Sequence, residues 1–438
     1  MIYALTKYHS ITDHWSLALS RRMIEHPPTK SFALQAEKVN QAGFADPSLP
    51  LAVVVASTRW DEPPRMRHQV TRQLMRWFNV LFVEFLPSRR QAPSAGYLRR
   101  VDERLLIFAP QTRFPVPIHA YANIPPVHWA VNRGYRDRIV ETVQSLGSRP
   151  VMLFNFVYDF PEIMALSLFS YKIYFCFDEW PRMWRRASKP WGPKFFYQSR
   201  LYQHYENQVA RRADRCLATH TPLEEKLRRV NPGTSLFLLA HEFNRIASFR
   251  PLVKSRAPIK VGFMGYITYR LMADWLTSVL NEEDIELFLI GPLSKLNLQP
   301  FLERKNFTHV PPLVGDSLLD KLAEMDVLIQ PYDPRIPENH VQTVSNKFFQ
   351  YVAAGRPVVI SDMPHYLEMP KGVLYRAKTA GEFINAIRQA HAEDCPEFVE
   401  TRLRIARENT WDKRGDSLYS MIQRAWAGKL PSAVAQAA

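Results

Sequence analysis

The sequence of 438 residues is poor in cysteine and glycine and contains no long hydrophobic run. Its three cysteines, Cys176, Cys216 and Cys395, are odd in number and widely separated, which excludes a disulfide framework and a cysteine-based metal site. Such sparse use of cysteine is typical of a reducing cytoplasm. No apolar stretch approaches the roughly 20 residues of a membrane-spanning helix, and the first residues lack a secretion signal. We therefore expect a cytoplasmic chain that is soluble or attached to the inner face of a membrane.

The short motifs of several well-known sites are also missing. The chain has no Walker A phosphate loop, no Gly-x-Gly-x-x-Gly after a strand, no His-Glu-x-x-His zinc motif and no Gly-x-Ser-x-Gly nucleophile turn. An Asp-x-Asp metal motif is absent as well. We therefore expect neither a bound metal nor a cofactor.

Positive charge is concentrated in the first half of the chain. Residues 1–250 contain 35 Lys and Arg against 20 Asp and Glu, whereas residues 251–438 contain 22 of each. The whole net charge of +15 thus belongs to the first half. This half is expected to face a polyanion or an anionic surface.

Short apolar strands alternate with helical stretches in two successive series. Residues 1–50 are poorly patterned and are interpreted as an extension. The first series covers 51–244, a polar linker covers 245–258, and the second series covers 259–410. Two such series predict an α/β fold with two Rossmann-like parallel-sheet domains. Ligands of such sheets bind in a cleft, at the carboxyl ends of the strands.

The most informative stretch, residues 344–362, reads as a helix start, a helix and a buried strand. Ser345 is suited to cap the helix, and Gly355 followed by Pro357 ends it. Lys347 lies in the first turn, where its ammonium group adds positive charge to the helix dipole. A strand end that leads into a helix N-terminus is a place where open α/β sheets bind anionic ligands.

The run Lys347-Phe-Phe-Gln350-Tyr351-Val-Ala-Ala-Gly-Arg-Pro-Val-Val resembles the nucleotide-sugar-binding segment of GT-B glycosyltransferases of the bacterial surface-polysaccharide type. That family has a Pro-Tyr loop, here at Tyr332, before Lys-Leu-x-Glu-Tyr-x-Ala-x-Gly-x-Pro-Val-Val. The Glu that grips the donor ribose is replaced by Gln350, as in some exopolysaccharide glucuronosyltransferases. An amide hydrogen-bonds a hydroxyl without charge assistance. The resemblance covers roughly residues 51–420.

Two further loops of the second series contain glycine, at Gly262-Phe-Met-Gly265-Tyr266 and at Gly291-Pro. Glycine lets a diphosphate approach the backbone closely, and all three loops are predicted to meet at one sheet edge. The alternative is that these are ordinary strand-ending glycines. The predicted donor-binding residues are Gly265, Tyr266, Gly291, Tyr332, Ser345, Lys347, Gln350 and Tyr351.

A buried strand of the first series ends in Asp178 and Glu179. A carboxylate at a strand end in the cleft is a candidate base for deprotonating an acceptor hydroxyl. The resemblance favours Asp178, because related transferases have a strand that ends in a similar acidic run. The alternative interpretation is that Asp178 caps the next turn.

The loop after the first strand resembles an acceptor-side loop of related sequences. Arg65 and Arg67 are candidates for holding an acceptor phosphate, and the alternative is a solvated helix start. His241 lies in a turn that resembles the family's domain junction and is a candidate for facing the donor phosphates, whereas Glu242 and Asn244 are at least as well suited to packing in the hinge. The predicted acceptor-side residues are Arg59, Asp61, Arg65, Arg67, His68 and His241.

A basic and aromatic segment follows Asp178, with no acidic residue between Trp180 and Tyr205. Aromatic side chains prefer the headgroup boundary, and Lys and Arg attract anionic lipids. The segment therefore predicts docking to the inner membrane surface, although prolines interrupt any single amphipathic helix and a basic surface loop is the alternative. The predicted docking residues are Trp184, Arg185, Arg186 and Trp191.

The resemblance implies transfer of a hexosyl or glycuronosyl group from a nucleotide donor, by preference UDP-linked, to a saccharide or lipid-linked saccharide acceptor. It also implies that a last helix within 411–438 crosses back to the first domain. No metal is required, because a helix dipole and basic side chains can stabilise the leaving diphosphate. Two alternatives stay open: a nucleotide-sugar epimerase of the same fold, and a basic nucleic-acid-binding protein, for which no known binding module is found.

Overall fold

The computed structural model describes residues 43–62, 64–85, 96–110, 121–147, 151–183, 193–248, 258–293 and 298–426. Most of the predicted extension, part of the predicted linker and the end of the chain lie outside these residues. The same holds for the predicted docking residues Trp184, Arg185, Arg186 and Trp191.

Within the described residues, the N-terminal domain is built on an eight-stranded sheet of order β3-β4-β2-β1-β5-β6-β7-β8. Neighbouring strands are parallel except β3 and β4, which are antiparallel. The strands are β1 (Leu51–Ala56), β2 (Asn79–Glu84), β3 (Tyr97–Asp102), β4 (Leu105–Ala109), β5 (Val151–Asn155), β6 (Tyr171–Cys176), β7 (Arg215–Ala218) and β8 (Thr234–Leu236). The helices are α3 (Met66–Leu74), α4 (Pro125–Ser145), α5 (Pro161–Met164), α6 (Trp180–Met183), α7 (Pro193–Arg212) and α8 (Thr221–Arg228).

The described part of the C-terminal domain has a six-stranded, fully parallel sheet of order β11-β10-β9-β12-β13-β14. The strands are β9 (Ile259–Met264), β10 (Ile285–Ile290), β11 (Phe307–Val310), β12 (Val327–Gln330), β13 (Val358–Ser361) and β14 (Leu374–Ala377). The helices are α9 (Ala273–Leu280), α10 (Gln299–Leu302), α11 (Gly315–Ala323), α12 (Pro337–His340), α13 (Asn346–Ala353), α14 (Ala380–Glu393), α15 (Pro396–Glu408) and α16 (Trp411–Ala425).

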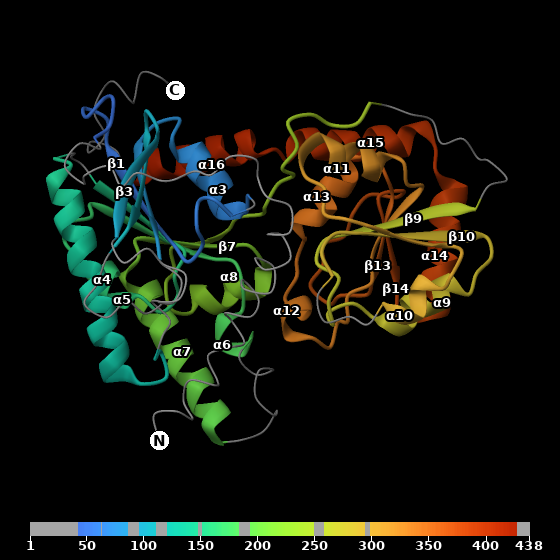
Figure 1. Ribbon diagram of the computed structural model, residues 1–438, viewed down its shortest axis with the longest axis horizontal. Coiled ribbons are helices and arrows are strands. Elements are labelled where there is room, and N and C mark those ends of the chain that lie inside the picture. The colour runs from blue at the N-terminus through green and yellow to red at the C-terminus, as the bar shows by residue number, and fades with distance from the viewer. Residues whose placement is uncertain are drawn as a thin grey trace.

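Apolar runs form the central strands of both sheets. Leu51–Ala56 and Val358–Ser361, for example, are buried along their whole length. Parallel strands that are covered by helices on both faces have this composition. The two faces of the N-terminal sheet carry separate cores, and the C-terminal domain has its own core. Figure 1 shows the two domains side by side. None of the described helices is both long and apolar enough to span a bilayer.

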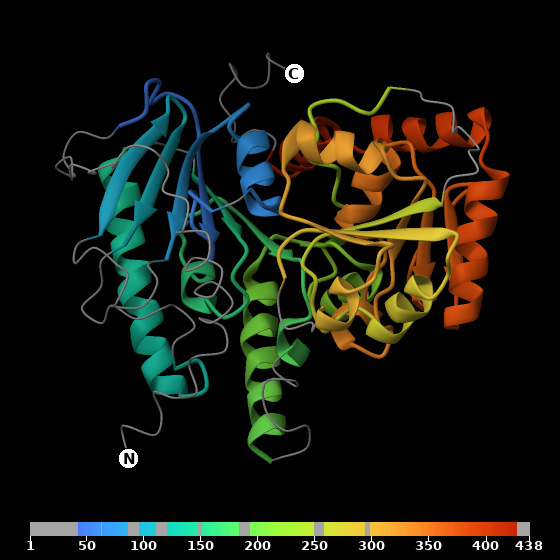
Figure 2. The ribbon, with the colours of Figure 1, turned by 45° about the vertical axis from the view of Figure 1, so that its right-hand side comes forward.

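The last helix, α16, leaves the C-terminal domain and packs on the N-terminal domain beside α3, as Figures 1 and 2 show. The rings of Trp77 and Tyr419 stack with centroids 4.3 Å apart. Gly415 allows the close approach, because a Cβ there would meet Oε1 of Gln73 at 2.1 Å. The chain end therefore joins the two domains a second time.

Strand β3 is not one of the short apolar runs of the sequence. Its sequence, YLRRVD, is largely polar, and it forms the outer edge of the sheet. The sequence pattern of this segment is only weakly typical of a strand. It forms one because it pairs with β4, and an edge strand needs only one buried face.

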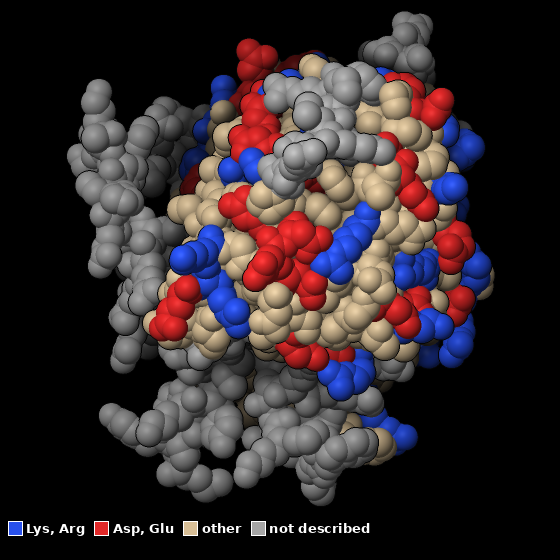
Figure 3. Space-filling view, turned by 90° about the vertical axis from the view of Figure 1, so that its right-hand side faces the viewer, with Lys and Arg blue, Asp and Glu red and all other residues tan. Residues whose placement is uncertain are grey.

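Acidic and basic side chains are intermixed over the outward face of the C-terminal domain, as Figure 3 shows. This distribution agrees with the equal numbers of acidic and basic residues in the second half of the sequence. Local ion pairs such as Arg388 with Glu282, at 2.6 Å, balance charge on this surface. An exposed pair of this kind contributes little to stability.

Candidate active site

The carboxyl ends of strands from both domains face each other, and the domains touch there. The backbone N–H of Thr221, at the start of α8, donates to Oγ1 of Thr343 over 2.7 Å. The N–H of Thr343 donates to Nδ1 of His220 over 3.2 Å. Burial lowers the pKa of His220 to about 4, so its ring is neutral and Nδ1 can accept this bond. The loop before α13 is thereby held against the N-terminal domain.

Helix α13 begins at this junction. The side chain of Ser345 caps it by accepting a bond of 3.2 Å from the N–H of Phe348, and the same hydroxyl donates to Gln330 over 2.9 Å. A capped helix start retains free backbone N–H groups and a partial positive charge, both of which attract anions. The sequence prediction that Ser345 starts this helix is confirmed.

Two glycines bring the loops after β9 and β10 to the same place. Gly265 and Gly291 have φ of 129° and 135°, a region open mainly to glycine. A Cβ on Gly265 would stand 2.3 Å from Cε of Lys347, and a Cβ on Gly291 would stand 2.3 Å from the carbonyl oxygen of Gly265. The loops therefore converge on Lys347 at one sheet edge, and only glycine fits at either position.

Polar groups that have no protein partner gather at the start of α13. The ammonium group of Lys347 forms no ion pair and no hydrogen bond with the described residues, and it lies 5.7 Å from the ring centroid of Tyr332. Oε1 of Gln350 is buried without a hydrogen-bond partner. Buried polar groups are nearly always hydrogen-bonded in folded proteins, so such a group of orphans indicates a place for a polar ligand.

Two of the predicted donor-binding tyrosines, Tyr351 and Tyr332, are buried. Tyr351 has no exposed area, and its hydroxyl accepts from the N–H of Met264 at 2.9 Å and donates to the carbonyl of Ile329 at 3.3 Å. The hydroxyl of Tyr351 thus ties β9 to β12. Tyr332 is 4% exposed and forms a floor beneath Lys347, whereas Tyr266 is exposed on its loop.

Asp178 lies directly after β6, on the facing domain. Its carboxylate accepts no hydrogen bond and forms no ion pair with any described residue, so it does not cap the next turn by such a bond. Burial raises its pKa to about 6, while the positive charges of Arg270 and Arg67 act in the opposite direction. A carboxylate with a pKa near neutrality is suited to accept a proton from a hydroxyl group.

Glu179, the neighbouring acid, is not free. It is 4% exposed and pairs with the ammonium group of Lys226 at 3.1 Å. Lys226 also pairs with the fully buried Glu206 at 2.7 Å. This cluster anchors α7 and α8 behind β6, and it leaves Asp178 as the acid that faces the cleft.

The predicted acceptor-side residues separate into two groups. His68 is 1% exposed, and its ring nitrogens lie 3.0 Å from the carbonyl of Arg59 and 3.0 Å from the N–H of Arg65. Asp61 accepts two bonds of 2.8 Å from Arg99 on β3. His68 and Asp61 therefore fix the loop in place, and the ring nitrogens of the buried His68 are used for bonds within that loop.

Arg65 and Arg67 differ although they belong to the same helix start. Arg65 is exposed and pairs with Glu62 at 3.4 Å. Arg67 is buried, with its guanidinium carbon 4.3 Å from the ring centroid of Phe177, the residue before Asp178. Arg67 thus reaches from α3 to the end of β6.

His241 lies at the domain junction. It is 3% exposed, its backbone pairs with Thr410, and its N–H donates to Asn409 over 3.3 Å. Burial lowers the pKa of its ring. The backbone of His241 therefore joins the end of the first domain to the segment before α16.

Known proteins share this architecture. No family model matches the chain. The "Putative teichuronic acid biosynthesis glycosyltransferase TuaH" of Bacillus subtilis (strain 168) is 24% identical over 272 residues, which are 58% of this chain and 67% of that protein. An alpha,alpha-trehalose-phosphate synthase (UDP-forming) from Burkholderia vietnamiensis has a TM-score of 0.60 at 10% identity and covers 87% of this chain and 98% of its own. The chain has the GT-B fold.

WaaG, a glycosyltransferase involved in lipopolysaccharide biosynthesis, has the same fold, with a TM-score of 0.56 at 11% identity over 85% of this chain and 99% of its own. The two predicted parallel-sheet domains and the resemblance to GT-B glycosyltransferases are thus confirmed. At these identities the solved structures establish the fold alone.

The sequence analysis did not identify Arg270, and it assigned Glu242 to hinge packing alone. Arg270 follows β9, its Nε donates to Asn339 over 2.7 Å, and its positive charge lowers the pKa of Asp178 across the cleft. Burial raises the pKa of Glu242 to about 7, against the charges of Arg72 and Lys347. Arg270 lies five positions after Gly265. This closeness to a predicted donor-binding glycine is the feature of the sequence that could have identified it.

Metal-binding geometry is absent from the described ranges. No group of three or more His, Cys, Asp or Glu side chains there is placed to hold an ion.

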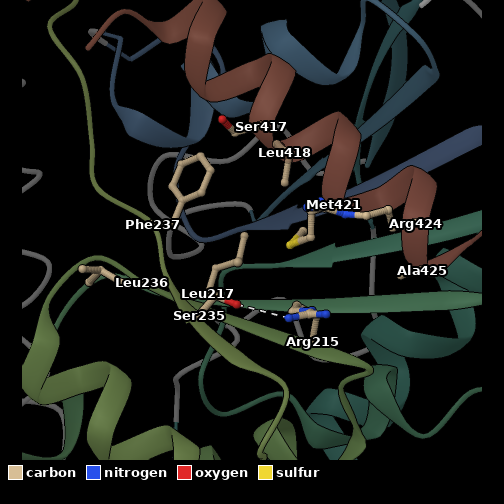
Figure 4. Close-up of a pocket in the computed structure, with 10 residues that line it drawn as sticks. All are labelled: Arg215, Leu217, Ser235, Leu236, Phe237, Ser417, Leu418, Met421, Arg424 and Ala425. Carbon is tan, nitrogen blue, oxygen red and sulfur yellow. Dashed lines mark hydrogen bonds between the residues drawn. The ribbon is translucent and has the colours of Figure 1, made fainter. Parts of the chain in front are cut away.

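A cavity of about 460 Å³ lies outside the cleft, beneath the crossing helix α16 (Figure 4). It is lined by Arg215, Leu217, Ser235, Leu236, Phe237, Ser417, Leu418, Met421, Arg424 and Ala425. Arg215 begins β7, at the end of that strand opposite the cleft, and donates to Ser235 over 3.2 Å. None of the predicted site residues lines this cavity.

Proposed function

We propose that this chain is a glycosyltransferase that moves a sugar from a UDP-linked donor to a saccharide acceptor. One observation carries the proposal: the unpaired ammonium group of Lys347 lies against the backbone of Gly265 at the capped start of α13. An ammonium group, free helix N–H groups and glycine loops together form a site for a diphosphate.

The transfer would proceed by attack of an acceptor hydroxyl on the anomeric carbon of the donor sugar. The bond from that carbon to the diphosphate oxygen breaks, and negative charge accumulates on the leaving nucleotide. Lys347 and the start of α13 would stabilise this charge. Asp178 would accept the proton of the hydroxyl, which corresponds to transfer with inversion. The buried amide of Gln350, whose Oε1 has no protein partner, would accept a hydrogen bond from a ribose hydroxyl.

The acceptor in this proposal is a saccharide of surface-polysaccharide assembly, carried on a lipid. Two similar proteins support this choice, because TuaH is named for teichuronic acid biosynthesis and WaaG is described as involved in lipopolysaccharide biosynthesis. The transferred group is a hexosyl or a glycuronosyl residue. No metal or cofactor takes part in the proposed step.

Attachment to the inner membrane surface belongs to the same proposal. Trp129 on α4 is 51% exposed, and Phe196 and Tyr197 on α7 are 59% and 51% exposed. Arg133 and Arg200 lie over the rings of Trp129 and Phe196, at 5.3 Å and 4.5 Å from the centroids.

The lower ends of α4 and α7 project from the N-terminal domain in the same direction in Figures 1 and 2. Aromatic rings with adjacent arginines suit an anionic lipid surface. Flotation with anionic and with neutral vesicles tests this attachment, and equal recovery with both would count against it.

Donor binding is the first test. Thermal shift and titration calorimetry with UDP, GDP, ADP and their sugars would identify the nucleotide, because a ligand of the folded state raises the melting temperature. We expect UDP and a UDP-sugar to bind. Absence of binding by every nucleotide would overturn the proposed function. Incubation of the bound UDP-sugar without an acceptor then tests the epimerase alternative, which would convert the sugar alone.

A further inference from the structure

Arg67 is a buried arginine without an acidic or hydrogen-bonding partner among the described residues. It is 6% exposed, its Nε is buried without a hydrogen bond, and its guanidinium forms no ion pair with any described residue. Burial lowers its pKa to about 10. Removing a cation from water is costly unless another group compensates, so this arrangement calls for an explanation.

Each of the other buried arginines of the described chain has a hydrogen-bonded partner, although Nε of Arg356, like that of Arg67, forms no hydrogen bond. Arg402, which is fully buried, donates to the carbonyl of Gly355 over 2.9 Å and pairs with Asp394 at 2.5 Å. Arg356, 7% exposed, donates to the carbonyl of Ala323 over 2.5 Å. The fold therefore provides partners where an arginine has only a structural role, and Arg67 is the exception.

The guanidinium of Arg67 lies beside the end of β6, next to the proposed base. It covers the ring of Phe177, which immediately precedes the proposed base Asp178. Arg65 lowers its pKa, whereas Asp178 and Glu62 raise it, yet neither acid is within ion-pair distance. A cation and a carboxylate thus remain unpaired near each other, which leaves each of them available to a ligand.

We propose that Arg67 binds an anionic group of the acceptor, a phosphate or a carboxylate, while Asp178 receives the acceptor hydroxyl. This proposal rests on the proposed function and names the acceptor class: a charged saccharide or saccharide phosphate. The guanidinium fork fits both anions through paired hydrogen bonds, and Phe177 supports its flat face. The energetic cost of burying Arg67 is then offset when the acceptor binds.

The test measures anion binding by calorimetry to protein saturated with UDP, so that the donor site is already filled. The probes are inorganic pyrophosphate for the phosphate class and methyl glucuronide for the carboxylate class, with methyl glucoside as the neutral control. We expect one of the two anions to bind to the wild type. Arg67→Gln should lower the affinity for that anion by about tenfold or more, since the bound anion loses its charged partner. The anion affinity of Arg67→Lys should lie between those of the wild type and Arg67→Gln, because lysine keeps the positive charge but lacks the forked geometry of the guanidinium group.

Arg404→Gln is the matched control, because Arg404 is an exposed arginine on α15 that pairs with Glu408 at 3.5 Å. It makes the same change in net charge and should leave anion binding unaltered. Each variant is first checked for UDP binding and for its melting temperature. UDP binding without binding of either anion overturns this inference and leaves the proposed function intact, as does equal anion binding by wild type and Arg67→Gln. If the wild-type protein does not bind UDP, the proposed function itself is overturned.

Discussion

The side chain of Lys347 occupies the space in which Gly265 would carry a methyl group: Cε lies 2.3 Å from the ideal Cβ position. The φ of Gly265, 129°, independently disfavours any other residue. The side chain of Lys347 and the backbone turn at Gly265, which belong to two separate loops, therefore pack directly against each other. Several experimental consequences depend on this contact and on the groups that face it.

Gly265→Ala should displace Lys347 and strain the loop after β9. We expect UDP affinity to fall by about tenfold or more, which corresponds to ~1.4 kcal/mol. Gly381→Ala serves as the control, because a Cβ there would meet nothing within 4 Å. The control should bind UDP normally. Unchanged UDP affinity of Gly265→Ala in calorimetry would contradict the fitted contact.

Lys347→Met removes the ammonium group but keeps a long side chain against Gly265. Hydrogen bonds to charged groups contribute about 1.5–3 kcal/mol, so we expect a roughly 10- to 100-fold loss of UDP affinity. Lys321→Met is a suitable comparison, because Lys321 lies on α11 and pairs with Glu324 at 2.7 Å. Similar UDP affinity in the two variants would argue against a role for Lys347.

Asp178→Asn should abolish turnover without affecting UDP affinity. Loss of a positioned base lowers rates by about 10²- to 10⁴-fold. Because burial raises the pKa of Asp178 to about 6, the folded protein binds this proton more tightly than the unfolded chain does. Ionised Asp178 therefore destabilises the fold, increasingly as the pH rises from about 4 to above 6. We expect the variant to melt at a higher temperature than wild type at pH 8, with the difference vanishing near pH 4. Retained turnover would exclude Asp178 as the base.

The pH dependence of turnover should report the same carboxyl group. Activity is expected to fall as the pH drops through about 6, where Asp178 becomes protonated. The positive charge of Arg270 lowers this pKa, so Arg270→Gln should move the acidic limb of the kcat/KM profile to higher pH. Arg335→Gln, a change at an arginine that is 84% exposed, is the comparison. A profile that stays in place in Arg270→Gln would show that Arg270 does not act on the essential base.

Gly415→Ala tests how the crossing helix is seated on the N-terminal domain. Its new methyl group would collide with Gln73, and overpacking of this kind costs typically about 1–3 kcal/mol. We expect a lower midpoint of denaturant unfolding and little change in UDP affinity, because the contact is made in the other domain. Wild-type stability of this variant would mean that the Gln73 side chain or α16 can shift at no cost.

The local pattern was sufficient to predict the alternating strands and helices, the start of α13 at Ser345 and the meeting of the loops at Gly265 and Gly291. Parallel strands place their carboxyl ends at one edge, so loops that follow such strands converge regardless of the details of packing. The residues that come together in those loops could therefore be predicted from the order of the strands along the chain.

Packing between distant segments decided which neighbours face the cleft. Gln350 and Tyr351 are adjacent on α13, but strands β9 and β12 bond the hydroxyl of Tyr351 and leave Oε1 of Gln350 without a partner. Arg67 and His68 are adjacent on α3, yet His68 bonds its own loop while Arg67 reaches Phe177 on another strand. The position of a residue along a helix predicts the face on which its side chain lies. Which groups that side chain contacts depends on residues far away in the chain. A chain's local order thus specifies where a site forms, and long-range contacts specify which groups in it stay unpaired.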